Sequence, residues 1–121
     1  MQERNIKVFV YGTLRKGQGN NYLLKEADFI GEAKTKDKYA MYASGIPYVV
    51  EDKSVSRITG EIFSVNQEEL MRLDRLEGHP QWYRRRVIPV TTEDGAVHHS
   101  WIYFNPHYMG KLVESGDYCK I

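Results

Sequence analysis

The apolar residues of the chain fall mostly into short runs, and most of these runs have the composition of β-strands. The first run, KVFVY over 7–11, is apolar on both faces, as expected for a central strand that is covered on both sides. Turns at 45–47 and at EDGA over 93–96 separate some of the later runs. These later strands are predicted at 28–35, at 37–44, directly after the turn at 45–47, at 57–65, at 83–92 and at 97–104.

One segment follows the 3.6-residue period of an amphipathic helix, NQEELMRLDRLEG over 66–78. Asn66 can cap its start, Glu69 can complete a capping box and Gly78 can end it. A shorter helix is predicted at 20–28, with Asn20 or Asn21 as its cap. Many short strands combined with one clear helix predict an α+β fold whose sheet curls toward a barrel.

A carboxyl group falls on the apolar side of the longer helix. The buried stripe is predicted to consist of Leu70, Leu73 and Leu76, and Glu77 projects within the same arc. Glu77 also lies in the last turn, where the helix dipole disfavours an anion. Burial and dipole together predict a raised pKa and a proton that exchanges near neutral pH. The alternative is that the helix frays before Glu77 and the side chain points into water.

Asp74, at the edge of the same stripe, is predicted to have a structural role. The YRRRV segment supplies arginines for Asp74, for Glu77 or for surface acids. Strand alternation separates Arg84 and Arg86 from Arg85, which favours ion pairing over a basic stripe for nucleic acid.

The segment GTLRKGQGNN over 12–21 forms a glycine-rich turn directly after the first strand. Gly12 and Gly17 have the spacing of a P-loop, but Gln18 and Gly19 stand where that motif requires lysine and serine or threonine. The G-x-G-x-x-G fingerprint of a dinucleotide site is absent as well. A strand followed by such a turn can instead expose successive backbone N–H groups, which would bind a carboxylate or an oxyanion. An ordinary tight turn is the alternative.

The composition points to a small-molecule partner. The 121 residues carry 17 basic and 16 acidic side chains, so the formal net charge of +1 creates no long-range field for nucleic acid or an anionic membrane. The length suits one domain spanning 1–121. A single cysteine, Cys119, excludes an intramolecular disulfide, and no apolar run resembles a signal peptide or a membrane span. We therefore expect a soluble protein of the reducing cytoplasm.

Other catalytic patterns are weak. His98 and His99 are adjacent in a predicted strand, so they point to opposite faces and do not share a metal ion. No metal-ligand spacing and no G-x-S-x-G nucleophile motif occur. The nine tyrosines are typical either of a cleft lined by rings with polar tips or of half-exposed strand faces.

Three segments together carry a resemblance to a known family: FVYGTLRKGQGNNYLL over 9–24, LDRLEGHPQWYRR over 73–85, and SGDY over 115–118. By these motifs the chain resembles the γ-glutamylcyclotransferase-like family. It is most similar to the γ-glutamylamine cyclotransferase branch and its small microbial relatives. The resemblance covers nearly the whole chain and implies a small barrel of mixed strands with flanking helices.

The resemblance also implies an activity and a site. In the implied reaction, the α-amine of a γ-glutamyl amine or amide attacks its own side-chain carbonyl, and 5-oxoproline and a free amine are released without a cofactor. Tyr11, Gly12, Thr13 and Leu14 would form the substrate loop. Glu77 would be the general acid and base.

Four more residues are candidates for the surroundings of this site. Tyr83 and Tyr118 are candidates for the substrate-binding wall, and Arg84 or Arg85 for holding the helix that carries Glu77. A packing role alone is the alternative for each of them. Two other functions stay open: a non-catalytic binding module for a glutamyl-like metabolite, and an interaction protein with a tyrosine-rich docking surface. A monomer or a weak homodimer is expected.

Overall fold

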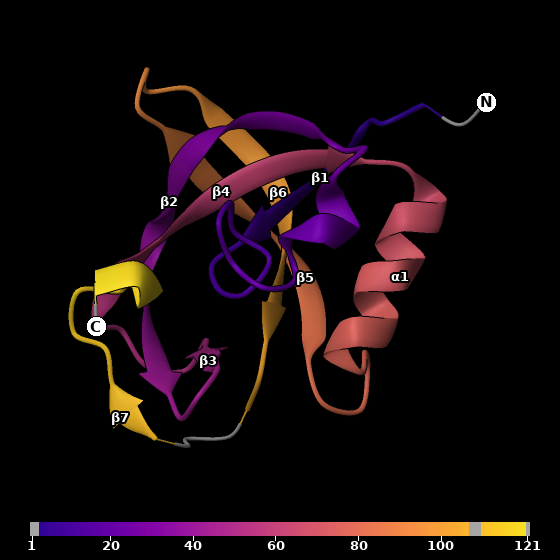
Figure 1. Cartoon of the computed structure of the whole chain (residues 1–121). Coiled ribbons are helices and arrows are strands. Elements are labelled where there is room, and N and C mark those ends of the chain that lie inside the picture. Colours follow the sequence, from indigo (N-terminus) through magenta and orange to yellow (C-terminus); the bar gives the residue numbers. More distant parts are fainter. Residues whose placement is uncertain (1–2, 107–109, 121) are drawn as a thin grey trace.

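The computed structural model describes residues 3–106 and 110–120. The barrel strands are β1 (Ile6–Val10), β2 (Asp28–Ala43), β4 (Ser56–Val65), β5 (Arg84–Thr92) and β6 (Val97–Phe104). They follow the order β2-β4-β1-β6-β5, and the barrel closes because β5 also pairs with β2 (Figure 1). β1 runs parallel to β6, while the other barrel pairs are antiparallel. The predicted α+β fold with a small mixed barrel is confirmed.

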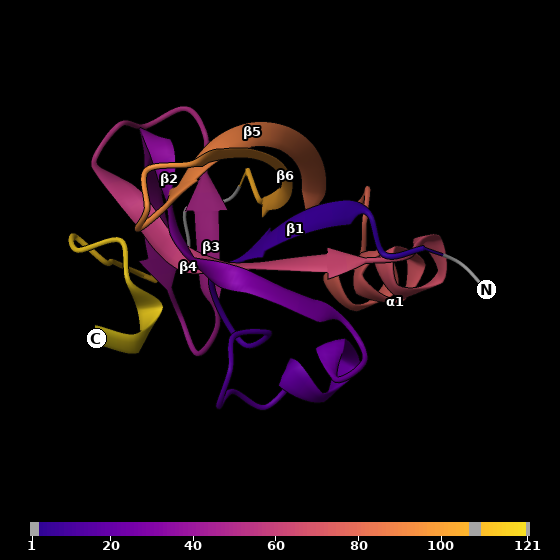
Figure 2. The same ribbon diagram turned by 90° about the horizontal axis from the view of Figure 1, so that it is seen from above.

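The remaining elements lie around the barrel. Short strands β3 (Pro47–Val50) and β7 (Lys111–Leu112) pair with the second half of β2. Figure 2 shows helix α1 (Gln67–Glu77) beside β1 and β4. Two 3₁₀ turns, η1 (Asn21–Leu24) and η2 (Tyr118–Lys120), complete the description.

The predicted helix at 20–28 is wrong in type and length. Only the four residues of η1 form a helical turn, and it is a 3₁₀ turn. The chain cannot continue as a helix because Asp28 already pairs with Ser64 in strand β4. Long-range strand pairing therefore overrides the local helix preference.

Strand β2 is a single 16-residue strand where two shorter strands were predicted. Its register with β4 shifts near the middle, so the chain bulges without ending the strand. The buried Thr35 side chain holds the bulge. Its Oγ1 donates to the Asp37 carbonyl at 2.7 Å and accepts from the Ile58 N–H at 2.8 Å. The boundary expected between the two strands is therefore a bend within one strand, and β2 pairs with the barrel strands before it and with β3 and β7 after it.

Strand β1 is buried on both faces from Val8 onward, which confirms the prediction of a central strand. Phe9 packs inside the barrel with residues such as Ile62. Val8, on the opposite face, packs in the cluster that contains Leu70 and Leu73 of α1. β1 therefore links the barrel interior to the layer under the helix, and its end is held firmly in the molecule.

Helix α1 begins and ends close to the predicted residues. The Asn66 side chain accepts from the Glu69 N–H at 2.8 Å, and the Glu69 carboxylate accepts from the Asn66 N–H at 2.9 Å, as in a capping box. Gly78 ends the helix with a φ of 65°.

The third leucine of the predicted buried stripe departs from expectation. Leu70 and Leu73 are buried, but Leu76 is 42% exposed. The prediction for Leu76 is wrong because the last turn of α1 lies over a cavity instead of over the barrel core. No helix in the described part of the chain, α1 included, is long and apolar enough to cross a membrane.

Candidate active site

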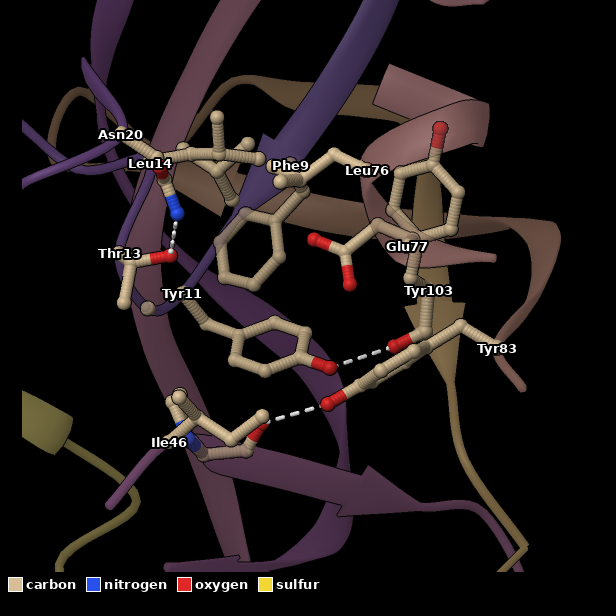
Figure 3. A pocket seen from close by; sticks show the side chains of 13 residues that line it. Phe9, Tyr11, Thr13, Leu14, Asn20, Ile46, Leu76, Glu77, Tyr83 and Tyr103 are labelled. Atoms are coloured by element: carbon tan, nitrogen blue, oxygen red, sulfur yellow. Dashed lines mark hydrogen bonds between the residues drawn. The ribbon is translucent and has the colours of Figure 1, made fainter. Parts of the chain in front are cut away.

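A cavity of about 140 Å³ opens where the end of β1 meets the end of α1 and the starts of β3 and β5 (Figure 3). All the site residues predicted from the sequence lie in its lining, except Tyr118. The glycine turn and the end of α1, which are distant in the sequence, therefore share one cavity. The lining consists of Phe9, Val10, Tyr11, Gly12, Thr13, Leu14, Asn20, Ile46, Pro47, Leu76, Glu77, Tyr83 and Tyr103.

Glu77 is the last residue of α1, and its carboxyl points into the cavity toward Phe9 and Tyr11 (Figure 3). Burial raises the pKa of this carboxyl to about 7. No described residue donates a hydrogen bond to it or forms an ion pair with it. The predicted rise in pKa is confirmed. The alternative of a frayed helix end is wrong, because the Gly78 N–H still bonds to carbonyls of the last turn.

The chain turns sharply after β1, and the turn residues line the cavity. The Gly12 carbonyl accepts from the Arg15 N–H at 3.0 Å, which closes the turn. A Cβ atom at Gly12 would lie 2.4 Å from Cγ of Pro47, so only glycine fits there. No described residue accepts a hydrogen bond from the backbone N–H of Gly12, Thr13 or Leu14. Three consecutive N–H groups thus have no acceptor in the part of the chain that the structure describes, as expected of an anion-binding turn.

Two asparagines hold the shape of this turn. The Asn20 N–H donates to the Thr13 carbonyl and its side-chain amide donates to Thr13 Oγ1, each at 2.9 Å. The Asn21 side chain donates to the Leu14 carbonyl at 2.8 Å. The sequence indicated these residues only as possible helix caps. Their actual role is to clamp the loop residues that face the cavity.

A buried ion cluster anchors the loop from behind. Arg15 Nη1 lies 2.8 Å from an oxygen of Asp117, and Arg15 Nε lies 3.7 Å from an oxygen of Glu61. The second oxygen of Glu61 accepts from the Lys16 N–H at 2.8 Å. Arg15, Glu61 and Asp117 are each at most 7% exposed. The SGDY segment therefore contributes an anchor through Asp117, and Glu61 is a site-supporting residue that no sequence pattern indicated.

The side chains of Tyr11 and Tyr83 lie in the same cavity as the carboxyl of Glu77 (Figure 3). The Tyr11 hydroxyl donates to the Tyr103 carbonyl at 2.6 Å, and the Tyr83 hydroxyl donates to the Pro47 carbonyl at 3.1 Å (Figure 3). Burial, together with the charge of Glu77, raises the pKa of both phenols above the ordinary value of 10.0. Both hydroxyls are therefore protonated donors near neutral pH. The Tyr83 ring also stacks on Tyr48, with centroids 6.0 Å apart and planes 2° from parallel.

A second polar network secures the helix that carries Glu77. Arg85 grips the Asp74 carboxylate with Nε at 2.8 Å and Nη2 at 3.2 Å, and the Tyr103 hydroxyl donates to the same carboxylate at 2.7 Å. The Arg85 guanidinium lies 4.3 Å from the centroid of the Trp101 ring. Arg84 instead donates to the Pro80 carbonyl at 3.3 Å and is exposed. Of the two candidate arginines, Arg85 is the one that holds the helix.

Tyr118 is the predicted site residue that the structure does not bring into the cavity lining. Its hydroxyl donates to the Gly45 carbonyl at 3.1 Å, and its ring packs against the barrel cluster. It thus supports the turn that contains Ile46, a lining residue. Among the described residues, no group of three or more histidine, cysteine, aspartate or glutamate side chains could hold a metal ion.

Comparison with known proteins agrees with this fold. Residues 8–120 match the model of the family described as "Gamma-glutamyl cyclotransferase, AIG2-like". The chain belongs to this family. This membership confirms the resemblance seen in the sequence and the prediction of a γ-glutamylcyclotransferase-like enzyme.

Relatives of the chain occur in distant organisms. "Putative gamma-glutamylcyclotransferase MJ1514" of Methanocaldococcus jannaschii is 52% identical over 112 residues, which cover 92% of this chain and 93% of that protein. "Gamma-glutamylaminecyclotransferase B" of Danio rerio is 37% identical over 121 residues, covering 86% of this chain and 63% of that protein. The crystal structure of an AIG2-like protein from Mus musculus matches with a TM-score of 0.76 at 28% identity, covering 88% and 81% of the two chains.

Proposed function

We propose that this chain is a cyclotransferase that acts on a γ-glutamyl amine or amide and releases 5-oxoproline and a free amine. One observation carries the proposal: Glu77, a half-buried carboxyl with a pKa of about 7 and no hydrogen-bond partner among the described residues, shares a cavity with Gly12, Thr13 and Leu14, whose backbone N–H groups also lack a described acceptor. Membership of the γ-glutamyl cyclotransferase family and the name of the zebrafish relative support the same substrate class.

The first task of the site in this proposal is orientation. The α-carboxylate of the γ-glutamyl group accepts hydrogen bonds from the N–H groups of residues 12–14. The described lining contains no lysine or arginine, so the turn is its natural anion-binding element. Nucleophile and electrophile belong to one molecule, and holding them in the reactive rotamer can contribute several kcal/mol, up to roughly 7 to 11.

The second task is proton transfer, which we assign to Glu77. The ionised carboxyl takes a proton from the α-amine as its nitrogen attacks the γ-carbonyl carbon. A new C–N bond closes the five-membered ring. The bond from the carbonyl carbon to the leaving nitrogen then breaks as the protonated Glu77 returns the proton to that nitrogen. One amide replaces another, so no water is consumed.

The third task is stabilisation of the oxyanion that develops on the carbonyl oxygen. Tyr11 and Tyr83 are the candidate donors, because burial keeps both hydroxyls protonated beside Glu77. Both now donate to backbone carbonyls, and the bond of Tyr83 is the longer one, at 3.1 Å against 2.6 Å. We therefore expect Tyr83 to turn to the substrate more readily.

Incubation of the purified protein with γ-glutamyl amines and amides tests the proposal. The expected result is release of 5-oxoproline and free amine in equal amounts. Glu77→Gln should abolish most of this release. Glu68→Gln is the matched control, because Glu68 is an exposed glutamate on the same helix that forms a surface ion pair with Arg72.

Two other results would favour the alternative functions. If these compounds raise the melting temperature but no 5-oxoproline forms, the chain is a binding module for a glutamyl-like metabolite. If there is neither a shift nor product, and the protein assembles as its concentration rises, an interaction protein is favoured.

A further inference from the structure

Two side chains mark the mouth of the cavity. Of the residues that line it, only Ile46 and Leu76 are exposed, by 44% and 42%. The other lining residues are buried or half-buried. Ile46 lies in the turn before β3 and Leu76 lies in the last turn of α1 (Figure 3). The mouth is therefore framed by two elements that are distant in the sequence.

The chemistry of this mouth is apolar. A single exposed leucine or isoleucine is ordinary on a protein surface, but here both side chains line the same cavity and are its exposed members. The described lining holds no lysine, arginine or aspartate, and Glu77 is its one carboxyl. A charged group placed between Ile46 and Leu76 would thus contact aliphatic side chains and would find no oppositely charged partner in the described lining at that point.

The position of Leu76 connects the mouth to the reaction. Leu76 directly precedes Glu77, the residue that returns the proton to the leaving nitrogen in the proposed mechanism. The leaving nitrogen must lie within reach of the Glu77 carboxyl. In the proposed mechanism the α-carboxylate occupies the turn at 12–14 and the leaving nitrogen lies beside Glu77, so the substituent on that nitrogen leaves the cavity past its exposed lining residues, Leu76 next to Glu77 and Ile46.

We propose that the leaving amine carries an uncharged, apolar substituent of several carbons, which packs between Ile46 and Leu76. This inference rests on the proposed cyclotransferase function and narrows its substrates to γ-glutamyl alkylamides and arylalkylamides. Ile46 and Leu76 are then the residues that determine specificity for the leaving group.

Three substrates test the inference: γ-glutamyl methylamide, γ-glutamyl pentylamide and γ-glutamyl (4-aminobutyl)amide. The last two have the same number of heavy atoms and differ only in a terminal methyl or ammonium group. We expect kcat/KM for 5-oxoproline release to be about 10-fold higher for the pentylamide than for either other compound, because only its chain gains from leaving water.

Variants at the mouth test the assignment of the two residues. Leu76→Gln or Ile46→Thr should reduce the preference for the pentylamide over the methylamide from about 10-fold to about 3-fold or less. Met71→Gln is the matched control, because Met71 is an apolar residue of α1 that is 50% exposed and lies outside the cavity lining. It should keep the full preference. The preference is a ratio within one variant, so partial loss of folded protein does not affect it.

The possible outcomes distinguish failure of this inference from failure of the proposed cyclotransferase function. If 5-oxoproline is released but the methylamide or the aminobutylamide reacts as well as the pentylamide, the inference is overturned and the cyclotransferase function stands. If no compound releases 5-oxoproline, the proposed function fails and the inference fails with it. A preference that Leu76→Gln and Ile46→Thr both leave intact would overturn the assignment of the mouth.

Discussion

Asp74 and Glu77 lie one turn apart on helix α1, yet their carboxyls have opposite properties. Burial alone raises the pKa of Asp74, but hydrogen bonds from Arg85 and Tyr103 outweigh it and leave the pKa below its ordinary value of 3.8. Glu77 receives no such bond from any described residue, and burial raises its pKa to about 7. The contrast comes from what faces each carboxyl, because both side chains belong to the same short helix.

The two carboxyls therefore have different roles on the helix. Asp74 faces β5 and β6, where Arg85 and Tyr103 fix it as a permanent charge that holds the helix in place. Glu77 faces the end of β1 and the cavity beside Tyr11, where its charge can change. A rigid ion pair one turn away thus positions a carboxyl that remains free to exchange a proton.

The largest effect on activity is expected from removal of the Glu77 carboxyl. Glu77→Gln keeps the shape of the side chain but not its titrating proton, and it should lower kcat by about 10² to 10⁴. The measurement is the initial rate of 5-oxoproline release. Glu68→Gln should leave the rate within about twofold, because surface changes of this kind are usually small. Unchanged turnover in a folded Glu77→Gln variant would remove Glu77 from the mechanism.

The same substitution should change how stability depends on pH. The folded pKa of Glu77, about 7, lies above the ordinary value of 4.5, so ionisation destabilises the folded state. This destabilisation is absent below pH 4.5, grows as the pH rises toward 7, and is complete above it. Glu77→Gln should therefore raise the free energy of unfolding at pH 8 by up to about 3 kcal/mol, but not at pH 4. Urea unfolding at the two pH values measures this, and equal differences at both would contradict it.

A smaller effect, on stability, is expected when the ion pair between Asp74 and Arg85 is broken. Arg85→Met leaves Asp74 without its guanidinium and should lower the free energy of unfolding at pH 7 by about 1 to 3 kcal/mol. The lowered pKa of Asp74 means that this contribution is present above its ordinary value of 3.8 and is lost as the pH falls through the folded value. The pH dependence is thus opposite in sign to that of Glu77.

The exposed pair on the same helix provides the control for this experiment. Arg72 binds Glu68 at 2.9 Å, but both side chains are about half exposed or more. Arg72→Met should therefore cost less than about 0.5 kcal/mol. Equal losses in Arg72→Met and Arg85→Met would show that the Asp74 pair does not anchor the helix.

The smallest expected effect concerns the loop anchor. Asp117→Asn weakens the ion cluster behind the turn at 12–14, but Arg15 keeps Glu61 as a second partner. We expect a loss of about 1 kcal/mol in substrate binding, which corresponds to roughly a fivefold rise in KM with kcat nearly unchanged. Steady-state kinetics measures the split. Glu114→Gln, at an exposed position nearby in the sequence, is the control, and a fall in kcat alone would contradict an anchoring role.

Several features could be predicted from the sequence because they depend on residues that are close together in the chain. The capping box between Asn66 and Glu69 needs a spacing of three residues, and the central strand needs one apolar run. The position of Glu77 on the apolar side of the helix follows from the helical period alone. The three segments that carry the family resemblance are also local, and each is continuous in the sequence.

Other features could not be predicted because their partners come from distant parts of the chain. Arg15 meets Asp117 across 102 positions, and no local pattern encodes that pair. The break expected inside β2 became a bulge because the Thr35 hydroxyl replaces a ladder partner for Ile58 of β4. Leu76 was expected in the core, but the helix end lies over the cavity and leaves it exposed.

The sequence by itself determined which side chain could titrate, since the helical period places Glu77 on the apolar face. Only the tertiary structure decided that it does, because a carboxyl keeps a raised pKa only where burial is not offset by a cation or a donor. Arg85 comes from β5 and reaches Asp74 instead of Glu77. That choice of partner depends on how strand and helix pack, and the sequence of the helix alone does not contain it.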